Sequence, residues 1–209
     1  QITKEEIFEF IKAALHEDVG TGDVTSLACI PAESRSKGKL LVKDAGILAG
    51  VAFAKYVFEY VDPTHSIEIL KNDGEDVVFG DIAFYVECNT RALLQAERLI
   101  LNTMQRMSGI ATLSSQFAFE VQGTKAKILD TRKTTPLFRM IEKWAVRIGG
   151  CYNYRDGLYD RFMPKDNHND ACGSITNSIL RINEYKKAQH LDLPITVEVR
   201  NLVELYEVL

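Results

Sequence analysis

The sequence predicts an α/β protein whose two halves differ in their hydrophobic pattern. Up to residue 110, amphipathic helices mix with strands that end at turn residues, which is typical of an α+β region. After a boundary near residues 109–123, short apolar strands alternate with helices, and this alternation favours βαβ units in a parallel sheet or barrel. Only about three such units fit before the chain ends, against the eight of a closed barrel. We therefore expect the barrel to be incomplete in this chain.

Before residue 90, the first half contains two expected helices and three expected strands. Residues 3–17 start with Thr3 and Glu6 at the spacing of a capping box and continue with apolar residues at helical spacing. Residues 18–26 are rich in Gly and capping residues, so we expect a loop there, with Asp23 as an N-cap rather than a ligand. The second helix is expected at residues 51–61, before Asp62-Pro63. Strands are expected at residues 37–42, 66–70 and 81–88.

The longest expected helix, residues 91–107, leads to the boundary. Beyond it, short apolar runs predict strands at residues 125–129, 158–163 and 195–199. Helices are expected at residues 137–148 and 174–189, and from Leu202 onward. The sequence ends inside this last helical pattern without a C-cap signal, so we expect the function to need residues beyond Leu209.

Composition and charge exclude several classes of protein. The 209 residues are 46% hydrophobic and 26% charged, with a net charge of −4, which is typical of a folded protein and not of a nucleic-acid binder. The longest apolar stretch, residues 45–54, has about half of the ~20 residues that a membrane-spanning helix needs. The first ten residues carry acids where a targeting peptide would carry bases, so we expect a cytoplasmic protein. The four cysteines lie far apart, which favours free thiols over disulfides or a zinc site.

Basic side chains concentrate in residues 130–168, which hold eight Lys and Arg against five Asp and Glu. The motif DTRKTTP, residues 130–136, leaves an expected strand and enters an expected helix. Its Thr131, Arg132 and Lys133 would lie beside a helix N-terminus, where anions bind. Lys165 follows the next expected strand. Because active sites of α/β folds gather at such strand ends, these cations favour an anionic small molecule as ligand.

Three further bases of this segment have a simpler interpretation. Arg139, Lys143 and Arg147 follow one another at a spacing of four, so they share one side of the expected helix 137–148. Charged residues at this spacing are typical of a solvated helix face. We therefore expect them to be exposed to solvent.

Five motifs, in chain order, carry a family resemblance that runs from residue 4 to residue 209. They are EDVGTGDVT (17–25), QRMSGIAT (105–112), LDTRKTTP (129–136), KDNH (165–168) and VEV (197–199). On these motifs the sequence resembles the quinolinate phosphoribosyltransferases. The resemblance implies an N-terminal α+β sandwich domain over residues 1–110 and an open α/β barrel over residues 111–209, whose C-terminal strands and Gly-rich phosphate loop are absent from this chain. It also implies a homodimer.

The implied reaction joins quinolinate to phosphoribosyl pyrophosphate in the presence of Mg²⁺. It releases pyrophosphate and CO₂ and gives nicotinate mononucleotide for NAD biosynthesis. Lys133 would contact the phosphoribosyl substrate, and Glu198 would serve the ribose or the metal ion. The implied catalytic residues are Arg132, Lys133, Lys165 and Glu198.

The implied quinolinate-binding set comprises six residues: Arg106, Thr131, Arg132, Tyr154, Arg155 and Lys165. Three of them, Arg132, Arg155 and Lys165, would hold the two carboxylates, and Thr131 would add a hydroxyl. Arg106 would reach in from the partner subunit of the homodimer. No nucleic acid or membrane is expected as a partner.

Two other interpretations stay open because the sequence departs from the family's motifs. Tyr154 stands where the family usually has His, and a phenol cannot be cationic near neutral pH. Arg200 replaces the second acid of the usual Val-Glu-Val-Glu strand, where period-2 alternation would put it on the face of Glu198. Tyr154 fits a related phosphoribosyltransferase with another aromatic acid as substrate. Arg200 fits a non-catalytic paralogue that binds a dicarboxylate without turnover.

Overall fold

The computed structural model describes residues 2–209, which divide along the chain into two compact units. Asn153 is the last residue of unit 1, and Tyr154 is the first residue of unit 2. The domain division predicted at residue 110 differs from this division into units and stays a prediction. None of the helices within residues 2–209 is both long and apolar enough to cross a membrane.

Unit 1 opens with two helices that side-chain caps define. Helix α1 (Lys4–Val19) has the predicted capping box, in which Glu6 N–H donates to Thr3 Oγ1 at 3.2 Å and Thr3 N–H donates to Glu6 Oε2 at 2.8 Å. Helix α1 extends to Val19 and helix α2 (Val24–Cys29) begins four residues after Gly20, so the loop predicted at residues 18–26 is confirmed only for residues 20–23. The predicted cap is confirmed, since Asp23 Oδ1 accepts from Ser26 N–H at 3.0 Å.

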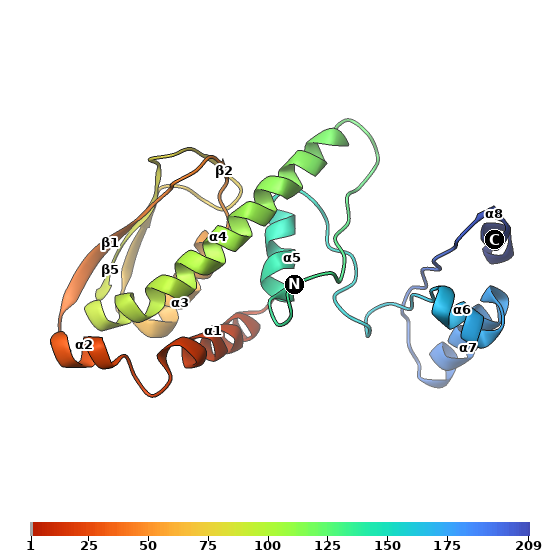
Figure 1. The fold of residues 1–209 in the computed structure, drawn as a ribbon, viewed down its shortest axis with the longest axis horizontal. Coiled ribbons are helices and arrows are strands. Elements are labelled where there is room, and N and C mark those ends of the chain that lie inside the picture. Colours follow the sequence, from red (N-terminus) through yellow and green to blue (C-terminus); the bar gives the residue numbers. More distant parts are fainter. Residues whose placement is uncertain (1) are drawn as a thin grey trace. The chain divides into compact units, whose positions relative to one another are not determined.

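A three-stranded antiparallel sheet in the order β1-β5-β3 forms one layer of unit 1 (Figure 1). Its strands match the three predicted ones to within two residues: β1 (Arg35–Leu41), β3 (Ser66–Ile69) and β5 (Ile82–Asn89). A second, two-stranded sheet was not predicted, because two residues per strand are too few to show a period. It pairs β2 (Gly46–Ile47) with β4 (Asp76–Val77), and helix α3 (Val51–Val61) follows β2 as expected.

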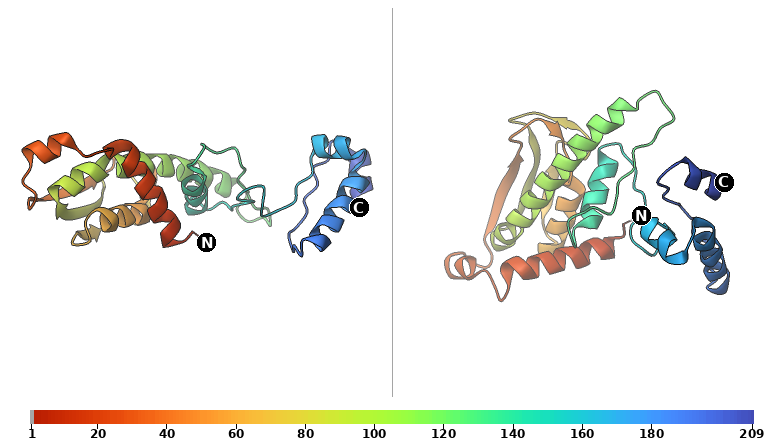
Figure 2. Two further views of the ribbon diagram at one scale, coloured as in Figure 1. Left: turned by 90° about the horizontal axis from the view of Figure 1, so that it is seen from below. Right: turned by 45° about the vertical axis from the view of Figure 1, so that its right-hand side comes forward.

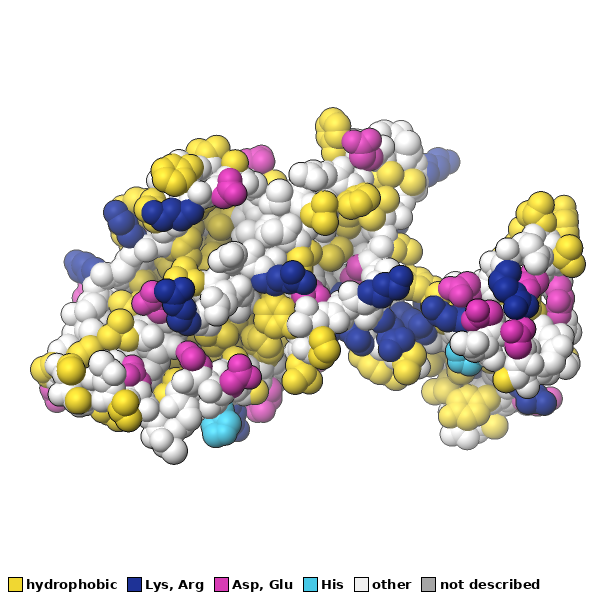
Figure 3. Space-filling view, in the orientation of Figure 1, with side chains coloured by type: hydrophobic (Ala, Val, Ile, Leu, Met, Phe, Trp, Pro, Cys, Tyr) yellow, Lys and Arg dark blue, Asp and Glu magenta, His cyan; other side chains and the backbone are white. Residues whose placement is uncertain are grey.

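Helix α4 (Thr90–Glu120) contacts both sheets, α1, α2, α3 and α5 (Arg139–Ile148) (Figures 1 and 2). It continues well past its predicted end at residue 107, since Ala111 and Ser114 are also buried. Beside them, Gly149 ends α5 so close to α4 that a Cβ would lie 2.3 Å from the Ala111 carbonyl oxygen. Toward the end of α4, Leu113, Phe117 and Phe119 are exposed, and Figure 3 shows hydrophobic side chains on the surface there.

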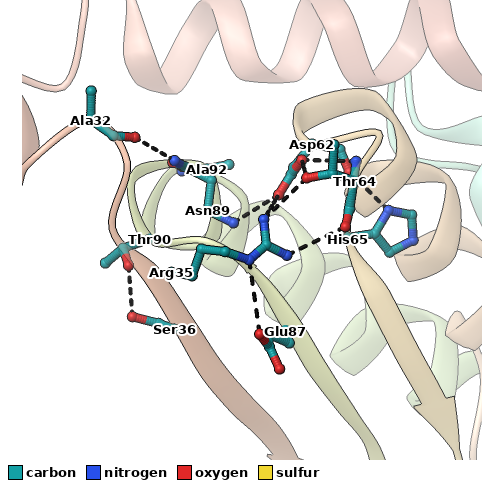
Figure 4. Close-up of polar contacts among 10 residues, drawn as sticks. All are labelled: Ala32, Arg35, Ser36, Asp62, Thr64, His65, Glu87, Asn89, Thr90 and Ala92. Atoms are coloured by element: carbon teal, nitrogen blue, oxygen red, sulfur yellow. Dashed lines mark hydrogen bonds and ion pairs between the residues drawn. The ribbon is translucent and has the colours of Figure 1, made fainter.

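Asp62 joins three elements of unit 1 at one end of the three-stranded sheet (Figure 4). Its side chain is 9% exposed, and its carboxylate accepts from Thr64 N–H at 2.9 Å, Thr64 Oγ1 at 2.6 Å and Asn89 N–H at 2.7 Å. Arg35 Nη1 lies 3.6 Å from Oδ2. Burial alone would raise the pKa of Asp62, but these hydrogen bonds and the Arg35 charge leave the pKa below its ordinary value. The carboxylate therefore ties α3, β1 and β5 together in its ionised form.

Gly38 in β1 lines a cavity of about 220 Å³ between the sheet and α4. A Cβ at this position would meet Val86 Cγ1 at 3.5 Å and Leu93 Cδ2 at 3.7 Å, which are ordinary contacts. Gly38→Ala should therefore raise the free energy of unfolding by about 0.5–1 kcal/mol, because Ala loses less chain entropy on folding and fills part of the cavity. Urea denaturation followed by circular dichroism measures this change.

Gly80→Ala is the matched control for Gly38→Ala. Gly80 also has room for a Cβ, but its φ of +96° is unfavourable for any side chain. The Gly80→Ala change should therefore lower the free energy of unfolding. A higher free energy of unfolding in Gly80→Ala, or a lower one in Gly38→Ala, would contradict these expectations.

Unit 2 contains three helices, α6 (Asp166–Cys172), α7 (Ile175–Ala188) and α8 (Leu202–Val208), and α7 contacts both others. Helices α7 and α8 were predicted, whereas α6 was not.

The three predicted strands of the second half are wrong as strands. Residues 125–129 contribute a single parallel bridge in unit 1, Leu129 to Tyr152, and residues 158–163 and 195–199 contribute another in unit 2, Phe162 to Ile195. Parallel ladders stabilise a strand through neighbours on both sides. Within residues 2–209 each of these segments pairs with a neighbour on one side only, and through a single bridge, so no strand forms.

Candidate active site

The loop of residues 130–136, here called the cationic loop, is held at its start by α5. The Asp130 carboxylate accepts from Lys143 Nζ at 2.5 Å and from Asn153 Nδ2 at 2.6 Å. The Lys143 and Asp130 side chains are only 5% and 8% exposed. Buried charges are tolerated when they are paired and hydrogen-bonded, so this pair fixes where the loop begins.

Glu142, the neighbour of Lys143 on α5, holds the end of the same loop. Thr135 donates its N–H to Glu142 Oε2 at 3.1 Å and its hydroxyl to Oε1 at 2.8 Å. Arg106 of α4 donates to Oε1 through Nε at 3.0 Å and Nη2 at 2.8 Å. Burial alone would raise the pKa of Glu142, but the hydrogen bonds from Arg106 and Thr135 and the Arg106 charge leave the pKa below its ordinary value. One ionised carboxylate thus joins Arg106 to the cationic loop.

Three predicted site residues, Thr131, Arg132 and Lys133, lie between these two anchors. Thr131 Oγ1 accepts from Lys133 N–H at 3.0 Å, and both residues are exposed. Arg132 is half-buried, and its Nε is buried without a hydrogen-bond partner among residues 2–209. An unpaired buried donor costs about 1–3 kcal/mol. The loop therefore holds a guanidinium with one buried donor that an anion would satisfy.

The predicted solvated face of α5 is wrong for Lys143, which is buried in its pair with Asp130. Arg147 is exposed as predicted, and Arg139 is half-buried, with Nε donating to Thr134 Oγ1 at 3.0 Å. A spacing of four places residues on one side of a helix, but it does not show which part of that side the protein covers. Here the cationic loop covers the middle of it.

In unit 2, Lys165 and Glu198 form an ion pair. Lys165 is the N-cap of α6, and its Nζ lies 3.6 Å from Glu198 Oε2, with both side chains about half exposed. Arg200 does not share these contacts: its Nε donates to Glu204 Oε1 at 2.6 Å, and its Nη2 donates to Asp170 Oδ1 at 3.2 Å. Glu198 and Arg200 therefore have different partners. The expected alternation does not apply here, because residues 195–199 form no strand and the chain bends at Arg200.

Arg155, the second predicted carboxylate ligand, is 9% exposed. It acts electrostatically on Asp160. Burial alone would raise the pKa of Asp160, but hydrogen bonds from the Asp156 and Gly157 backbone and the Arg155 charge leave the pKa below its ordinary value. Arg155 is thus a buried cation beside an ionised carboxylate.

Tyr154 belongs to a small cluster that the sequence did not reveal. Its hydroxyl donates to Thr196 Oγ1 at 2.6 Å, and Arg161 Nη1 donates to the same oxygen at 3.1 Å. The Arg161 guanidinium also lies 4.7 Å from the centre of the Tyr154 ring, a cation–π distance. Tyr154 stands where the family usually has His, and although a phenol carries no positive charge, the Arg161 cation lies next to its ring.

The predicted site residues are divided between the two units. Unit 1 brings together Arg106 and the cationic loop, and unit 2 brings together Lys165 with Glu198 and Arg155 with Asp160. The residues that sequence reasoning missed are Asp130, Glu142, Lys143 and Asn153, which support the loop. The sequence held one signal for Glu142: it is the only acid of α5, where it stands among three bases and could be expected to pair with a cation.

Mg²⁺ is bound in proteins through one or two carboxylates together with substrate phosphates. No group of three or more His, Cys, Asp or Glu converges anywhere in residues 2–209. The predicted metal ligand, Glu198, is one carboxylate already paired with Lys165. These residues do not fit a metal centre built by this chain alone.

Two family models match the chain almost from end to end. The model of the quinolinate phosphoribosyl transferase N-terminal domain matches residues 23–108, and that of the C-terminal domain matches residues 110–209. The chain is 47% identical over 200 residues to the chloroplastic nicotinate-nucleotide pyrophosphorylase (carboxylating) of Arabidopsis thaliana, covering 95% of this chain and 57% of that protein. It is 44% identical over 202 residues to the mitochondrial quinolinate phosphoribosyltransferase (decarboxylating) 2b of Nicotiana tabacum, covering 96% and 57%. The chain thus spans little more than half the length of these plant relatives.

Solved structures show the same fold. The crystal structure of NadC from Streptococcus pyogenes matches with a TM-score of 0.89 at 35% identity, over 99% of this chain and 72% of that one. The nicotinate-nucleotide pyrophosphorylase from Ehrlichia chaffeensis matches with a TM-score of 0.87 at 36% identity, over 100% and 73%. These matches confirm the predicted fold class and the resemblance on which the site residues were chosen.

Proposed function

Because the chain belongs to the quinolinate phosphoribosyltransferase family, we propose that the intact protein makes nicotinate mononucleotide from quinolinate and phosphoribosyl pyrophosphate. The observation that carries the proposal is the cationic loop. Its Arg132 has a buried, unpaired donor, and Lys133 is exposed beside it. A dicarboxylate with a phosphorylated co-substrate supplies the anions that such a loop lacks.

In the proposed reaction, the quinolinate ring nitrogen attacks C1 of the ribose, and pyrophosphate leaves with the electron pair of the C1–O bond. The ring nitrogen then carries positive charge, so the adjacent carboxylate leaves as CO₂ and the ring carbon takes up a proton. Fixed cations stabilise the charge that develops on the leaving group. We assign Arg132, Arg155 and Lys165 to the carboxylates and Lys133 to the phosphoribosyl substrate.

The other predicted residues have supporting roles in the proposal. Thr131 and Tyr154 offer hydroxyls toward quinolinate, and Glu198 serves the ribose or the metal ion. Mg²⁺ would enter as a companion of the pyrophosphate group, because the described residues do not form a metal centre by themselves.

Two measurements on the intact protein test the function. Calorimetry measures quinolinate binding, and a coupled assay measures release of pyrophosphate in the presence of phosphoribosyl pyrophosphate and Mg²⁺. The proposal expects both. Binding without release would favour the non-catalytic paralogue, and release with another aromatic acid but not with quinolinate would favour the related transferase.

The proposal includes a homodimer in which Arg106 serves the partner's site, and mixing subunits tests it. Arg106→Ala and Arg132→Ala proteins, each nearly inactive, are allowed to exchange subunits. If Arg106 acts across the dimer, each mixed dimer has one doubly altered site and one intact site. Random pairing makes about half of the dimers mixed, so roughly a quarter of the unaltered activity should return.

If Arg106 instead serves its own subunit, every site keeps one defect and no activity returns. Exchange is verified by native mass spectrometry with one protein isotope-labelled. No recovery after verified exchange would contradict the shared site. The exposed Leu113, Phe117 and Phe119 of α4 support an interface near Arg106 on the same helix.

We also propose a cytoplasmic location. The names of the plant relatives place those proteins in chloroplasts or mitochondria. Fractionation of cells that express the intact, tagged protein distinguishes a cytoplasmic from an organellar location. Enrichment in an organelle would contradict the proposal.

A further inference from the structure

Glu142 occupies a position that the proposed function does not use. Its side chain is 7% exposed, and its carboxylate receives four hydrogen bonds, two from Thr135 and two from Arg106. The Arg106 side chain is 55% exposed, so Glu142 holds one edge of a guanidinium that otherwise faces solvent. An exposed surface ion pair is usually mobile. This one is anchored because its acid is buried.

The bonds to Thr135 fix Glu142 itself. One comes from a backbone N–H and the other from a hydroxyl, and they engage both oxygens of the carboxylate. The side chain therefore cannot turn without losing a bond. Thr135, at the end of the cationic loop, thus holds Glu142, and Glu142 in turn holds the Arg106 guanidinium.

We propose that Glu142 is a positioning residue that aims Arg106 at quinolinate. The inference rests on the proposed function and adds a consequence to it. In a dimer where Arg106 serves the partner's site, Glu142 acts on the partner's site as well, although its other contacts belong to the loop of its own subunit. Each site then depends on the Glu142 of the opposite subunit.

The substitution Glu142→Gln tests this with little change of shape. The amide keeps one acceptor, but its NH₂ faces either the Arg106 donors or the Thr135 N–H, so one set of bonds is lost. We expect quinolinate binding, measured by calorimetry on the intact protein, to weaken about tenfold, the scale of one charge-assisted hydrogen bond. In the Arg106→Ala background the same change should weaken binding less than about twofold. An equal loss in both backgrounds would overturn the proposal.

Subunit mixing separates action through Arg106 from action on the loop. If Glu142 acts through Arg106, Glu142→Gln subunits mixed with Arg132→Ala subunits should form intact sites and recover about a quarter of the activity at low quinolinate. Mixed with Arg106→Ala subunits, they should recover none. If Glu142 acts on its own loop, the two outcomes exchange places, which would overturn the proposal.

Asp62→Asn is the matched control, because Asp62 is also a buried carboxylate of unit 1 with a lowered pKa and lies outside the site. It should lower the stability but leave quinolinate binding within about twofold. If Glu142→Gln does not fold, Thr135→Val removes one of the bonds that fix Glu142 and is measured in the same two backgrounds.

Failure of the proposed function gives a different result. If the unaltered protein binds quinolinate without releasing pyrophosphate, only the proposed reaction fails, and the two-background comparison still decides the role of Glu142. If the unaltered protein binds no quinolinate, both proposals are overturned.

Discussion

Lys143→Met should lower the free energy of unfolding of the intact protein by ~3–5 kcal/mol, because it breaks the buried ion pair between Lys143 and the Asp130 carboxylate. Asn153 remains as a hydrogen-bond donor to Asp130, but an amide does not neutralise the charge. Met keeps the volume of the aliphatic chain, so the loss reports the charge and not a cavity. Urea denaturation measures it.

Lys4→Met is the control that isolates burial. Lys4 Nζ lies 2.5 Å from Glu59 Oε1, the same separation as between Lys143 and Asp130, but its side chain is 45% exposed against 5%. An exposed pair contributes about 0–1 kcal/mol, so Lys4→Met should have little effect. The double change Asp130→Asn/Lys143→Met should recover part of the loss, since it removes the buried carboxylate charge together with its Lys143 partner. Equal effects of Lys143→Met and Lys4→Met would show that burial of the pair does not decide its contribution.

Arg132→Lys should lower kcat/KM for quinolinate by about 30- to 1000-fold, or ~2–4 kcal/mol of transition-state stabilisation. An ammonium is a single point charge and cannot make the two parallel hydrogen bonds of a guanidinium to a carboxylate. The Nε that is now buried and unpaired would also be lost, so the loop would keep a charge but not the planar donor set. Steady-state kinetics with each substrate varied in turn measures the change.

Two comparisons show whether this effect belongs to the site. Arg147→Lys changes an exposed arginine on α5 and should leave both Michaelis constants unaltered. Lys133→Ala should raise the Michaelis constant for phosphoribosyl pyrophosphate more than that for quinolinate. If Arg132→Lys and Lys133→Ala change the two constants in the same proportion, the assigned division between the substrates is wrong.

Local signals predicted the elements that depend on neighbours in the sequence. The Thr3–Glu6 capping box and the Asp23 cap are decided within three residues, and both are present. The periodicity of α7 and the alternation in the strands of the first sheet also lie within one element. Helix α4 was predicted to end at residue 107, just before the expected boundary at residues 109–123, whereas the packing of Ala111 and Ser114 carries the helix through Gly109.

The sequence by itself determined the fold class and the chemistry of the candidate site, because motifs such as DTRKTTP state which groups are present and in what order. Only the tertiary structure decided which of those groups are fixed by hydrogen bonds or ion pairs, and which residues provide these contacts. Lys143 and Glu142 look like ordinary charges of a helix surface, yet they bind Asp130, Thr135 and Arg106. Burial of a charge depends on segments that arrive from elsewhere in the chain, and no local pattern records which segment will cover a given helix face.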